Sequence, residues 1–336
     1  MFDIMKGKYY ESDYEEALID LLVQQGWEYT HGGSISRNNR EVLFVDDLML
    51  YLQQRYPDLQ HGDIEEIINR LRHVSGQTHF ELLRNTYYLV RDGFRYIRNQ
   101  DGETFDIEFV DFEAQNKNNI YRCVNQFEVG YGQKNDIRIP DVLLFVNGIP
   151  LCVFELKNPT DFNATIADAY DQIHIRYKRD IPHLLRYAPL SCISDATINN
   201  TKLGTTYTPY NHYYVWKKVN NEDESAKRGT DQVKTIVAGV YEPNRFLEII
   251  RDFVYFPDKK HDKEEEVVCR YPQFFATRML KESVLKAHSA NSSKGGTYFG
   301  ATGCGKTYTM MFLARQLSLR CKELGSPTIV MIVDRD

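Results

Sequence analysis

A glycine-rich loop near the end of the sequence restricts the fold more than any other feature of the chain. The pattern G-x-x-x-x-G-K-T is formed by Gly300, Ala301, Thr302, Gly303, Cys304, Gly305, Lys306 and Thr307. In such a loop the backbone N–H groups converge on phosphate oxygens, the lysine reaches the β- and γ-phosphates, and the threonine hydroxyl binds Mg²⁺. The loop therefore predicts a site for a nucleoside triphosphate.

The sequence on both sides of the loop supports this interpretation. Residues 296–299 have the composition of a short strand, and residues 306–324 have a helical pattern of apolar side chains. Residues 328–333 read as a second strand, which would complete a β-α-β unit. The alternative is a glycine-rich turn before an ordinary helix. No acidic strand end that could bind Mg²⁺ follows, so we expect the first part of a longer nucleotide hydrolase, unable to turn over ATP alone.

Composition and length narrow the class of protein. A chain of 336 residues, 42% hydrophobic and 26% charged, has the length and composition of about two soluble domains. It contains no apolar run of about 18 residues and no signal-peptide core, so we expect a cytoplasmic protein without a membrane span. The six cysteines form no C-x-x-C pair, which predicts free thiols.

The charge distribution restricts any nucleic-acid surface to a local patch. A net charge of −6 argues against a uniformly basic surface. The best local candidate is the basic stretch at residues 173–187, in which Tyr177 and Tyr187 alternate with His174, Arg176, Lys178, Arg179, His183 and Arg186. This stretch could follow a DNA backbone, or it could be the solvated side of a helix and a loop. The stretch by itself favours neither.

Periodicity and turn residues divide the rest of the chain into elements. We expect helices at residues 12–26, 45–55, 63–74, around Glu81 and at 164–177, and strands at 87–90, between 104 and 157, at 191–197 and at 213–217. Two polar stretches, 219–232 and 258–266, read as an excursion loop and as a charged domain linker. The aromatic residues between 207 and 216 are expected in the core rather than on a base-stacking surface.

A second group of candidate residues lies on a predicted β-hairpin. The Asn-Gly dipeptide at 147–148 separates two apolar runs, which is a strong hairpin signal. Regular pairing from this turn would bring Glu155 opposite Pro140. A one-residue bulge beside Pro150 would bring it opposite Asp141 instead, with the two Cβ atoms about 5 Å apart.

These residues can support metal-dependent chemistry. Because side chains alternate along a strand, Glu155 and Lys157 share one face. Two carboxylates and an ammonium group can bind Mg²⁺ through hard oxygen ligands and place a cation beside an attacking water. Asp141, Glu155 and Lys157 are therefore candidate catalytic residues of a nuclease. The pattern P-D…E-x-K is short, and two strand ends with solvated charges would also produce it.

The sequence around the hairpin resembles the R (restriction and motor) subunit of type I restriction endonucleases. The similarity is carried, in one order, by NQF, RIPDVLLFV, NGIPLCVFELKNP, RYPQFFA and GGTYFGATGCGKTYTM. The resemblance implies an α/β PD-(D/E)xK nuclease domain, a mixed sheet flanked by helices, followed by a RecA-like motor of superfamily 2. It also implies that Asp141 and Glu155 bind the metal, that Lys157 is the catalytic lysine, and that the glycine-rich loop binds ATP.

The resemblance extends to further residues. Gln273 matches a glutamine that can read the adenine ring, and residues 333–335 match the start of the next motor motif. The family has a Q-x-x-x-Y motif after the lysine, but here Gln172 and Tyr177 have four intervening residues. A shared helix face then requires a π-bulge or a helix end between them. We expect Gln172 to matter more than Tyr177, because its placement does not depend on the extra residue.

Glu15 has two interpretations. It matches an acidic residue on the first helix that serves many such nucleases as an auxiliary metal ligand. It also follows Ser12 by three residues, the spacing of a helix capping box. Both interpretations stay open at this point.

The sequence as a whole predicts a nuclease domain at residues 1–257, a linker at 258–266 and the start of a first RecA-like domain at 267–336. The resemblance implies an enzyme that uses Mg²⁺ and ATP, cleaves unmodified double-stranded DNA, and assembles with specificity and methylation subunits. Two alternatives remain: an inactive nuclease fold that serves as a scaffold or DNA-binding motor subunit, and a stand-alone superfamily 2 helicase.

Overall fold

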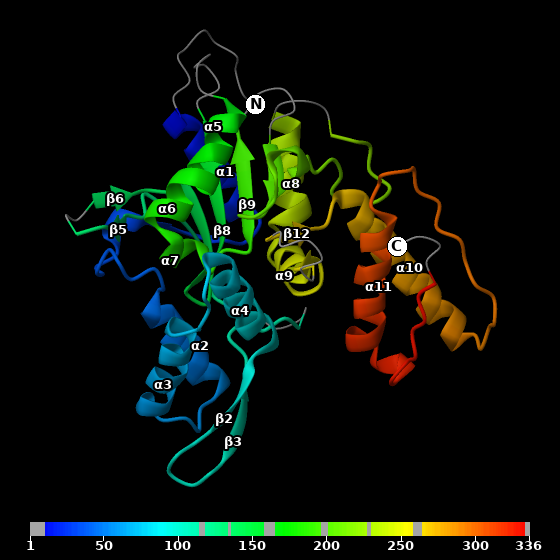
Figure 1. The fold of residues 1–336 in the computed structure, drawn as a ribbon, viewed down its shortest axis with the longest axis horizontal. Coiled ribbons are helices and arrows are strands. Elements are labelled where there is room, and N and C mark those ends of the chain that lie inside the picture. The colour runs from blue at the N-terminus through cyan, green and yellow to red at the C-terminus, as the bar shows by residue number, and fades with distance from the viewer. Residues whose placement is uncertain are drawn as a thin grey trace.

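A six-stranded mixed sheet forms the centre of the fold (Figure 1). The structure is a computed structural model that describes residues 11–113, 118–133, 136–157, 165–195, 201–226, 230–257 and 264–332. In sheet order its strands are β1 (Glu28–His31), β4 (Tyr121–Asn125), β7 (Val142–Val146), β8 (Ile149–Leu156), β9 (Leu190–Ser194) and β10 (Thr201–Gly204). The pairs β1–β4 and β8–β9 are parallel, and the other neighbours are antiparallel. The expected α/β class with a mixed sheet flanked by helices is confirmed.

The Asn-Gly dipeptide forms the β7–β8 turn as the sequence predicts. Asn147 and Gly148 have φ angles of 50° and 79°, the left-handed values that such a turn requires. Both strands are buried along their whole length, which explains their unbroken apolar sequence. A register shift between Leu144 and Phe145, beside Pro150, supplies the one-residue bulge.

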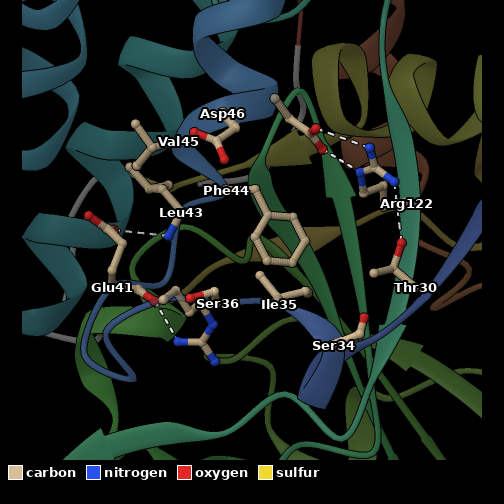
Figure 2. A pocket seen from close by; sticks show the side chains of 12 residues that line it. Thr30, Ser34, Ile35, Ser36, Glu41, Leu43, Phe44, Val45, Asp46 and Arg122 are labelled. Atoms are coloured by element: carbon tan, nitrogen blue, oxygen red, sulfur yellow. Dashed lines mark hydrogen bonds and ion pairs between the residues drawn. The ribbon is translucent and has the colours of Figure 1, made fainter.

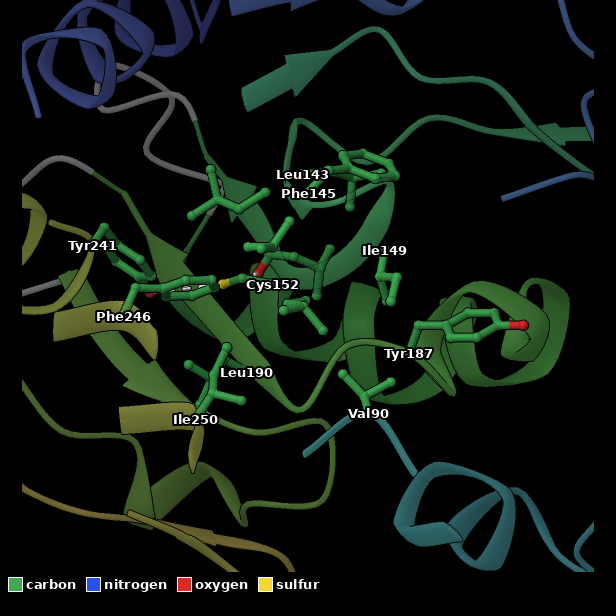
Figure 3. Packing of buried hydrophobic residues seen from close by; sticks show 14 of the residues in the cluster. Val90, Leu143, Phe145, Ile149, Cys152, Tyr187, Leu190, Tyr241, Phe246 and Ile250 are labelled. Atoms are coloured by element: carbon green, nitrogen blue, oxygen red, sulfur yellow. Dashed lines mark hydrogen bonds between the residues drawn. The ribbon is translucent and has the colours of Figure 1, made fainter. Parts of the chain in front are cut away.

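Helices cover both faces of the sheet. One face carries α1 (Glu11–Gln24), α8 (Thr230–Val240) and α9 (Pro243–Asp252). Between α8 and α9, Tyr241 packs its ring 4.7 Å from that of Phe154, and Figure 3 shows Tyr241 and Phe246 beside Cys152 in the core. The other face carries α5 (Ile166–Asp171), a π-helix (Gln172–Tyr177), α6 (Lys178–Asp180) and α7 (Pro182–Leu185).

A mostly helical insertion separates β1 from β4 along the chain. It contains a 3-10 turn (Gly32–Ser34), α2 (Val45–Arg55), α3 (His61–Arg72), α4 (His79–Asp92) and the hairpin of β2 (Phe94–Ile97) and β3 (Thr104–Ile107). In Figure 1 the α2, α3 and β2–β3 elements extend away from the sheet. A small hairpin of β5 (Val129–Tyr131) and β6 (Asp136–Arg138) lies between β4 and β7 in sequence.

Two predicted strands are wrong. Residues 87–90 lie inside α4, which Thr78 caps by accepting a hydrogen bond from the Glu81 N–H at 3.2 Å. Their aromatic and β-branched composition favoured a strand, but helical packing of the whole segment overrides that local preference. Residues 213–217 form no strand and make only an isolated bridge, in which Tyr214 pairs with Leu203 of β10.

The aromatic residues between 207 and 216 lie in or against the core, as expected. Tyr213 and Trp216 are 3% and 1% exposed. Tyr207 and Tyr210 are partly buried and pack against the same cluster. Burial of these rings therefore does not need the strand that the sequence suggested.

The C-terminal part of the described chain packs on α9. Its elements are β12 (Val267–Val268), α10 (Tyr271–Ser289), α11 (Lys306–Arg320) and a 3-10 turn (Lys322–Leu324), and β12 pairs with β11 (Val254–Tyr255) directly after α9. The Phe253 ring lies 5.0 Å from that of Phe274 and 5.2 Å from that of Phe312. The β11–β12 pair thus joins the segments on either side of the charged stretch 258–266. Residues 258–263 of that stretch lie outside the described residues.

The two strands expected around the glycine-rich loop are not formed. Residues 296–299 and 328–332 have no strand pairing in the described structure, and Phe299 is 92% exposed. A strand exists only with a hydrogen-bonded neighbour, and the described residues provide none for either segment. The helix after the loop does form and begins at Lys306, as the sequence predicts.

Two expectations from composition can be compared with the fold. None of the helices in the described ranges is long and apolar enough to cross a membrane. All six cysteines are free thiols, as predicted, and all except Cys304 are buried.

Candidate active site

The β7–β8 hairpin brings two acidic residues to one edge of the sheet. Because the bulge leaves Val142 opposite Phe154, Asp141 and Glu155 occupy the next pair of positions. The Oδ2 atom of Asp141 accepts a hydrogen bond from the Leu156 N–H at 2.5 Å. This bond ties the start of β7 to the end of β8, so the bulge has the effect that the sequence analysis required.

Two side chains hold the carboxylate of Glu155, which is fully buried. Lys157 Nζ lies 2.8 Å from Glu155 Oε1 and also donates to the Leu156 carbonyl at 2.9 Å. The Tyr177 hydroxyl donates to Glu155 Oε2 at 2.9 Å. A buried charge is tolerated only when it is paired and hydrogen-bonded, and these contacts meet that requirement. The predicted residues Asp141, Glu155 and Lys157 therefore lie together.

The helix after the lysine contains a π-helical turn, one of the two arrangements that the spacing of Gln172 and Tyr177 allowed. It spans Gln172–Tyr177, so the extra residue is absorbed by i→i+5 bonding and the two ends of the turn share a face. Gln172 Nε2 donates to the Tyr177 hydroxyl oxygen at 2.9 Å. Burial and the charge of Glu155 raise the pKa of Tyr177 well above its ordinary value, so its hydroxyl stays protonated and donates to that carboxylate.

Hydrogen bonds through the buried Tyr213 side chain connect the π-helix to Thr205 and Ser191. His174 Nε2 lies 3.0 Å from the Tyr213 hydroxyl, and the His174 ring stacks on Tyr170 with centroids 3.9 Å apart. The Tyr213 hydroxyl donates to the Thr205 carbonyl at 2.8 Å and contacts the Ser191 hydroxyl at 2.5 Å. Burial lowers the pKa of His174 to about 3, so the imidazole is neutral at neutral pH.

Glu15 reaches the sheet from the opposite face. It is 8% exposed and accepts a hydrogen bond from Asn125 Nδ2 at 2.6 Å. The pairing register places Asn125 on the face away from Glu155, because side chains alternate along each strand. Ser12 lies inside α1 rather than before it, so the capping-box interpretation of Glu15 is wrong.

The donor set on the hairpin fits a divalent cation that prefers hard oxygen ligands. Asp141 and Glu155 supply carboxylates from neighbouring strands, and the Leu156 carbonyl shares the Lys157 ammonium with Glu155 Oε1. Mg²⁺ binds through one or two such carboxylates and keeps water in its other positions. Among the described residues no group of three or more acidic, histidine or cysteine side chains could hold a metal ion, so Glu15 does not complete such a group.

In the glycine-rich loop, the lysine side chain contacts the loop's own backbone, and most of the loop residues are exposed to solvent. Lys306 Nζ donates to the carbonyls of Gly300 and Ala301 at 2.8 and 3.2 Å, which places a positive charge inside the loop. Gly305 has a φ of 81°, and a Cβ atom there would lie 2.1 Å from Gln273 Nε2. Its left-handed φ favours glycine, and a larger residue there would displace the flexible Gln273 side chain. The N-terminus of α11 follows directly, as an anion site requires.

Gln273 connects the first turn of α10 to this loop. Its Oε1 accepts from the Arg270 N–H at 2.8 Å, and its Nε2 lies 3.3 and 3.2 Å from the carbonyls of Cys304 and Gly305. The side chain is 3% exposed and lines a pocket with Arg270 and Tyr308. The match at residues 333–335 lies outside the described residues.

The cations of the basic stretch differ in exposure and in their partners. Lys178 Nζ lies 3.5 Å above the Tyr207 ring, and burial lowers the pKa of this lysine to about 8. Arg179 pairs with Asp180 at 2.7 Å. Arg176 and Arg179 are exposed, whereas the other cations of the stretch are at least half-buried. The stretch is therefore not a uniformly solvated surface, and its contact with a DNA backbone stays a prediction.

Sequence analysis did not find the backbone groups of the site or the packing role of His174. The Leu156 N–H and the Ile139 carbonyl, which lies 3.3 Å from the Tyr177 hydroxyl, carry no signal in residue type. His174 was grouped with the basic residues, although its spacing of four from Tyr170 is a signal for ring stacking on one helix face.

A second cleft lies beside β1 on the face of the sheet that Glu155 shares. Figure 2 shows it between Thr30 and Arg122 on the sheet and Phe44 before α2. Arg122 is paired with Asp47 at 2.5 Å and with Glu28 at 2.7 Å, so its charge is satisfied within the protein. None of the sequence-predicted site residues lines this cleft.

Known protein families match the segments of the chain that contain the two candidate sites. The family model described as "Type I restriction enzyme R protein N terminus" matches residues 8–212, which contain the hairpin and the π-helix. The chain belongs to this family. A second family model, "SWI2/SNF2 ATPase", matches residues 272–336, which contain Gln273 and the glycine-rich loop.

Curated members of the R-protein family align along nearly the whole chain. The type I restriction enzyme HindI endonuclease subunit of Haemophilus influenzae is 31% identical over 340 residues, which cover 97% of this chain and 32% of the relative. The putative type I restriction enzyme MjaIXP endonuclease subunit of Methanocaldococcus jannaschii is 27% identical over 354 residues, 96% of this chain and 32% of the relative. The chain thus spans about a third of the length of these relatives.

Proposed function

We propose that this chain is part of the R subunit of a type I restriction enzyme, and that Asp141, Glu155 and Lys157 form a Mg²⁺-dependent DNA endonuclease centre of the PD-(D/E)xK type. The main observation behind the proposal is the set of contacts of the Glu155 carboxylate. This carboxylate is fully buried and contacts both Lys157, at the end of its own strand, and Tyr177, on the π-helix. Strand-end charges without a function stay in solvent, because burying an ionised carboxylate costs several kcal/mol unless partners offset it.

Each residue has a separate role in the proposed centre. Asp141 and Glu155 hold Mg²⁺, which when bound polarises the scissile phosphate and lowers the pKa of an attacking water. Lys157 places its ammonium group beside Glu155 Oε1, where it stabilises negative charge that develops on the phosphate. Tyr177 fixes the orientation of Glu155 through Oε2, and Gln172 fixes the Tyr177 hydroxyl.

The proposal includes an ATP-dependent DNA translocase with RecA-like architecture. Its phosphate site is the loop at residues 300–307, in which Lys306 already provides the central positive charge. Gln273 contacts this loop and lines the adjoining pocket, which supports a role in adenine recognition. The similarity of residues 272–336 to SWI2/SNF2 ATPases supports the motor assignment.

The proposed substrate is double-stranded DNA, and the proposed partners are specificity and methylation subunits. The relatives are named as endonuclease subunits of type I restriction enzymes. Base recognition requires side chains that reach base edges, and nothing in this sequence resembles a module for that purpose. Target selection therefore belongs to the partners in this proposal.

The test is DNA cleavage and ATP hydrolysis by the full-length protein assembled with its partner subunits. Asp141→Ala, Glu155→Ala and Lys157→Ala should each lower Mg²⁺-dependent cleavage about 100-fold or more and leave ATP hydrolysis near the wild-type rate. Asp106→Ala is the matched control, because Asp106 is an exposed carboxylate on the β2–β3 hairpin and should change neither activity. Undiminished cleavage by any of the three variants would sink the proposed centre. A wild-type complex that hydrolyses ATP but never cleaves would favour the inactive-scaffold alternative.

A further inference from the structure

The π-helix that carries the contact between Tyr177 and Glu155 also contains Arg176. In a helix with i→i+5 hydrogen bonds, the residues at i+4 and i+5 both lie one turn above residue i. With Gln172 at position i, Tyr177 is at i+5 and Arg176 is at i+4. In an α-helical motif with three intervening residues, the residue before the tyrosine would be at i+3, which is also a neighbour of the glutamine one turn away. In the π-helix the corresponding position is i+4, so Arg176 occupies the side of the helix that carries the Gln172–Tyr177 pair.

Arg176 differs from the other cations of the basic stretch in exposure and in pairing. It is exposed, and no hydrogen bond, ion pair or ring contact joins it to another residue in the described ranges. Lys178 instead packs on Tyr207. Arg186 donates to the Leu71 carbonyl at 3.1 Å. Within the described part of the stretch, Arg176 is the exposed cation that remains available to an external anion.

The neighbouring exposed arginine is committed to the protein. Arg179 pairs with Asp180 at 2.7 Å, and Arg138 pairs with the same carboxylate at 2.7 Å. This pairing fastens the β5–β6 hairpin to α6, so Arg179 has a structural partner that Arg176 lacks. The two arginines, three positions apart, form a natural pair of test and control residues.

The proposed substrate needs a positive charge at this position. A DNA backbone that enters the centre brings phosphates toward Asp141 and Glu155, which repel them. The ammonium group of Lys157 is already engaged by Glu155 and the Leu156 carbonyl. A guanidinium group binds phosphate with two parallel N–H donors and keeps its charge at every working pH. Arg176 combines this chemistry with solvent exposure on the turn that contacts Glu155.

We propose that Arg176, which the π-helix places on the same side as Gln172 and Tyr177, binds a backbone phosphate of the DNA next to the scissile one. The inference rests on the proposed nuclease function. It adds to the carboxylates and the lysine a residue that holds the substrate strand rather than the metal.

The test is the salt dependence of DNA binding by the full-length protein, measured without divalent cations so that no cleavage occurs. Arg176→Gln should reduce the slope of log affinity against log salt by about one unit, because one phosphate contact is lost. In cleavage assays the same variant should raise the KM for DNA roughly tenfold with a smaller change in kcat, as expected for loss of a charged hydrogen bond. Arg176→Lys should restore most of the slope.

Two control variants separate a specific phosphate contact of Arg176 from a general effect of lost positive charge. Arg179→Gln and Arg95→Gln, both exposed but paired with aspartates, should leave the slope unchanged. An unchanged slope and KM in Arg176→Gln, with wild-type cleavage intact, would overturn this inference and leave the nuclease centre standing. An equal loss of slope in Arg179→Gln would also overturn it, since the contact would not be specific. Wild-type rates of cleavage in Asp141→Ala would instead overturn the proposed function.

Discussion

At the scale of single residues, hydrogen bonds to Glu155 change the relative importance for cleavage that we expect of Tyr177 and Gln172. Spacing alone favoured Gln172, whose position does not depend on the extra residue. In the structure Tyr177 contacts Glu155 directly, and Gln172 contacts only the Tyr177 hydroxyl within this trio. The order of importance is therefore expected to be reversed. Sequence could predict that the two residues meet, but hydrogen-bond direction depends on atomic positions that residue spacing does not determine.

Removal of the Tyr177 hydroxyl should impair cleavage more than removal of the Gln172 amide. Tyr177→Phe loses a hydrogen bond to a buried carboxylate and should lower the cleavage rate roughly tenfold or more. Gln172→Ala should have a smaller effect, and the double variant should be no worse than Tyr177→Phe, because Gln172 acts through the hydroxyl. Cleavage rates of the four proteins at saturating DNA check this. Additive losses from the two single changes would mean that Gln172 has an independent role.

At the scale of elements, the β7–β8 hairpin positions the proposed centre, and its turn is tightly constrained. Gly148 has a φ of 79°, and a Cβ atom there would lie 2.1 Å from the Phe44 carbonyl oxygen. The Phe44 N–H also donates to the Gly148 carbonyl at 2.9 Å. The turn is therefore packed against the residue that precedes α2, and its geometry sets the register that pairs Asp141 with Glu155.

Substitution of this glycine should destabilise the fold. Gly148→Ala should lower the free energy of unfolding by about 2 kcal/mol or more, because it combines backbone strain with a steric clash. Gly102→Ala is the matched control, since Gly102 has a φ of 74° but no atom within 4 Å of an added Cβ. It should cost only about 1 kcal/mol. Denaturant unfolding of both variants measures the difference, and equal losses would show that the clash with Phe44 is relieved elsewhere.

Elements with strong local signals could be predicted from the sequence, and elements that depend on distant partners could not. The Asn-Gly turn, the bulge, and the need for either a π-bulge or a helix end between Gln172 and Tyr177 followed from spacing and side-chain alternation over a few residues. The helical state of residues 87–90 depends on the packing of all of α4, whose composition also suits a strand. The segments 296–299 and 328–332 have strand composition but no pairing partner in the described structure. Local composition therefore overestimates strands where the neighbour is missing.

At the scale of the whole molecule, the two proposed sites are connected through α9. Arg320 on α11 forms an ion pair at 3.0 Å with Asp252, which is 2% exposed at the end of α9. Arg315 donates to the carbonyls of Val254 and Arg251 at 3.1 and 2.6 Å. The helix that follows the glycine-rich loop is thus fixed to the helix layer behind the central sheet. Mg²⁺ is proposed for both sites, so a decisive measurement has to separate them.

That measurement is divalent-cation binding by the full-length protein in the absence of nucleotide, with Mn²⁺ as the probe for the Mg²⁺ site. The account predicts that wild type binds the ion and that Glu155→Gln loses most of this binding, because a carboxylate ligand is removed. Lys306→Ala and Glu15→Gln should bind as wild type does, since neither side chain belongs to the hairpin centre. Wild-type affinity in Glu155→Gln, or loss of binding in Glu15→Gln alone, would contradict the proposed centre.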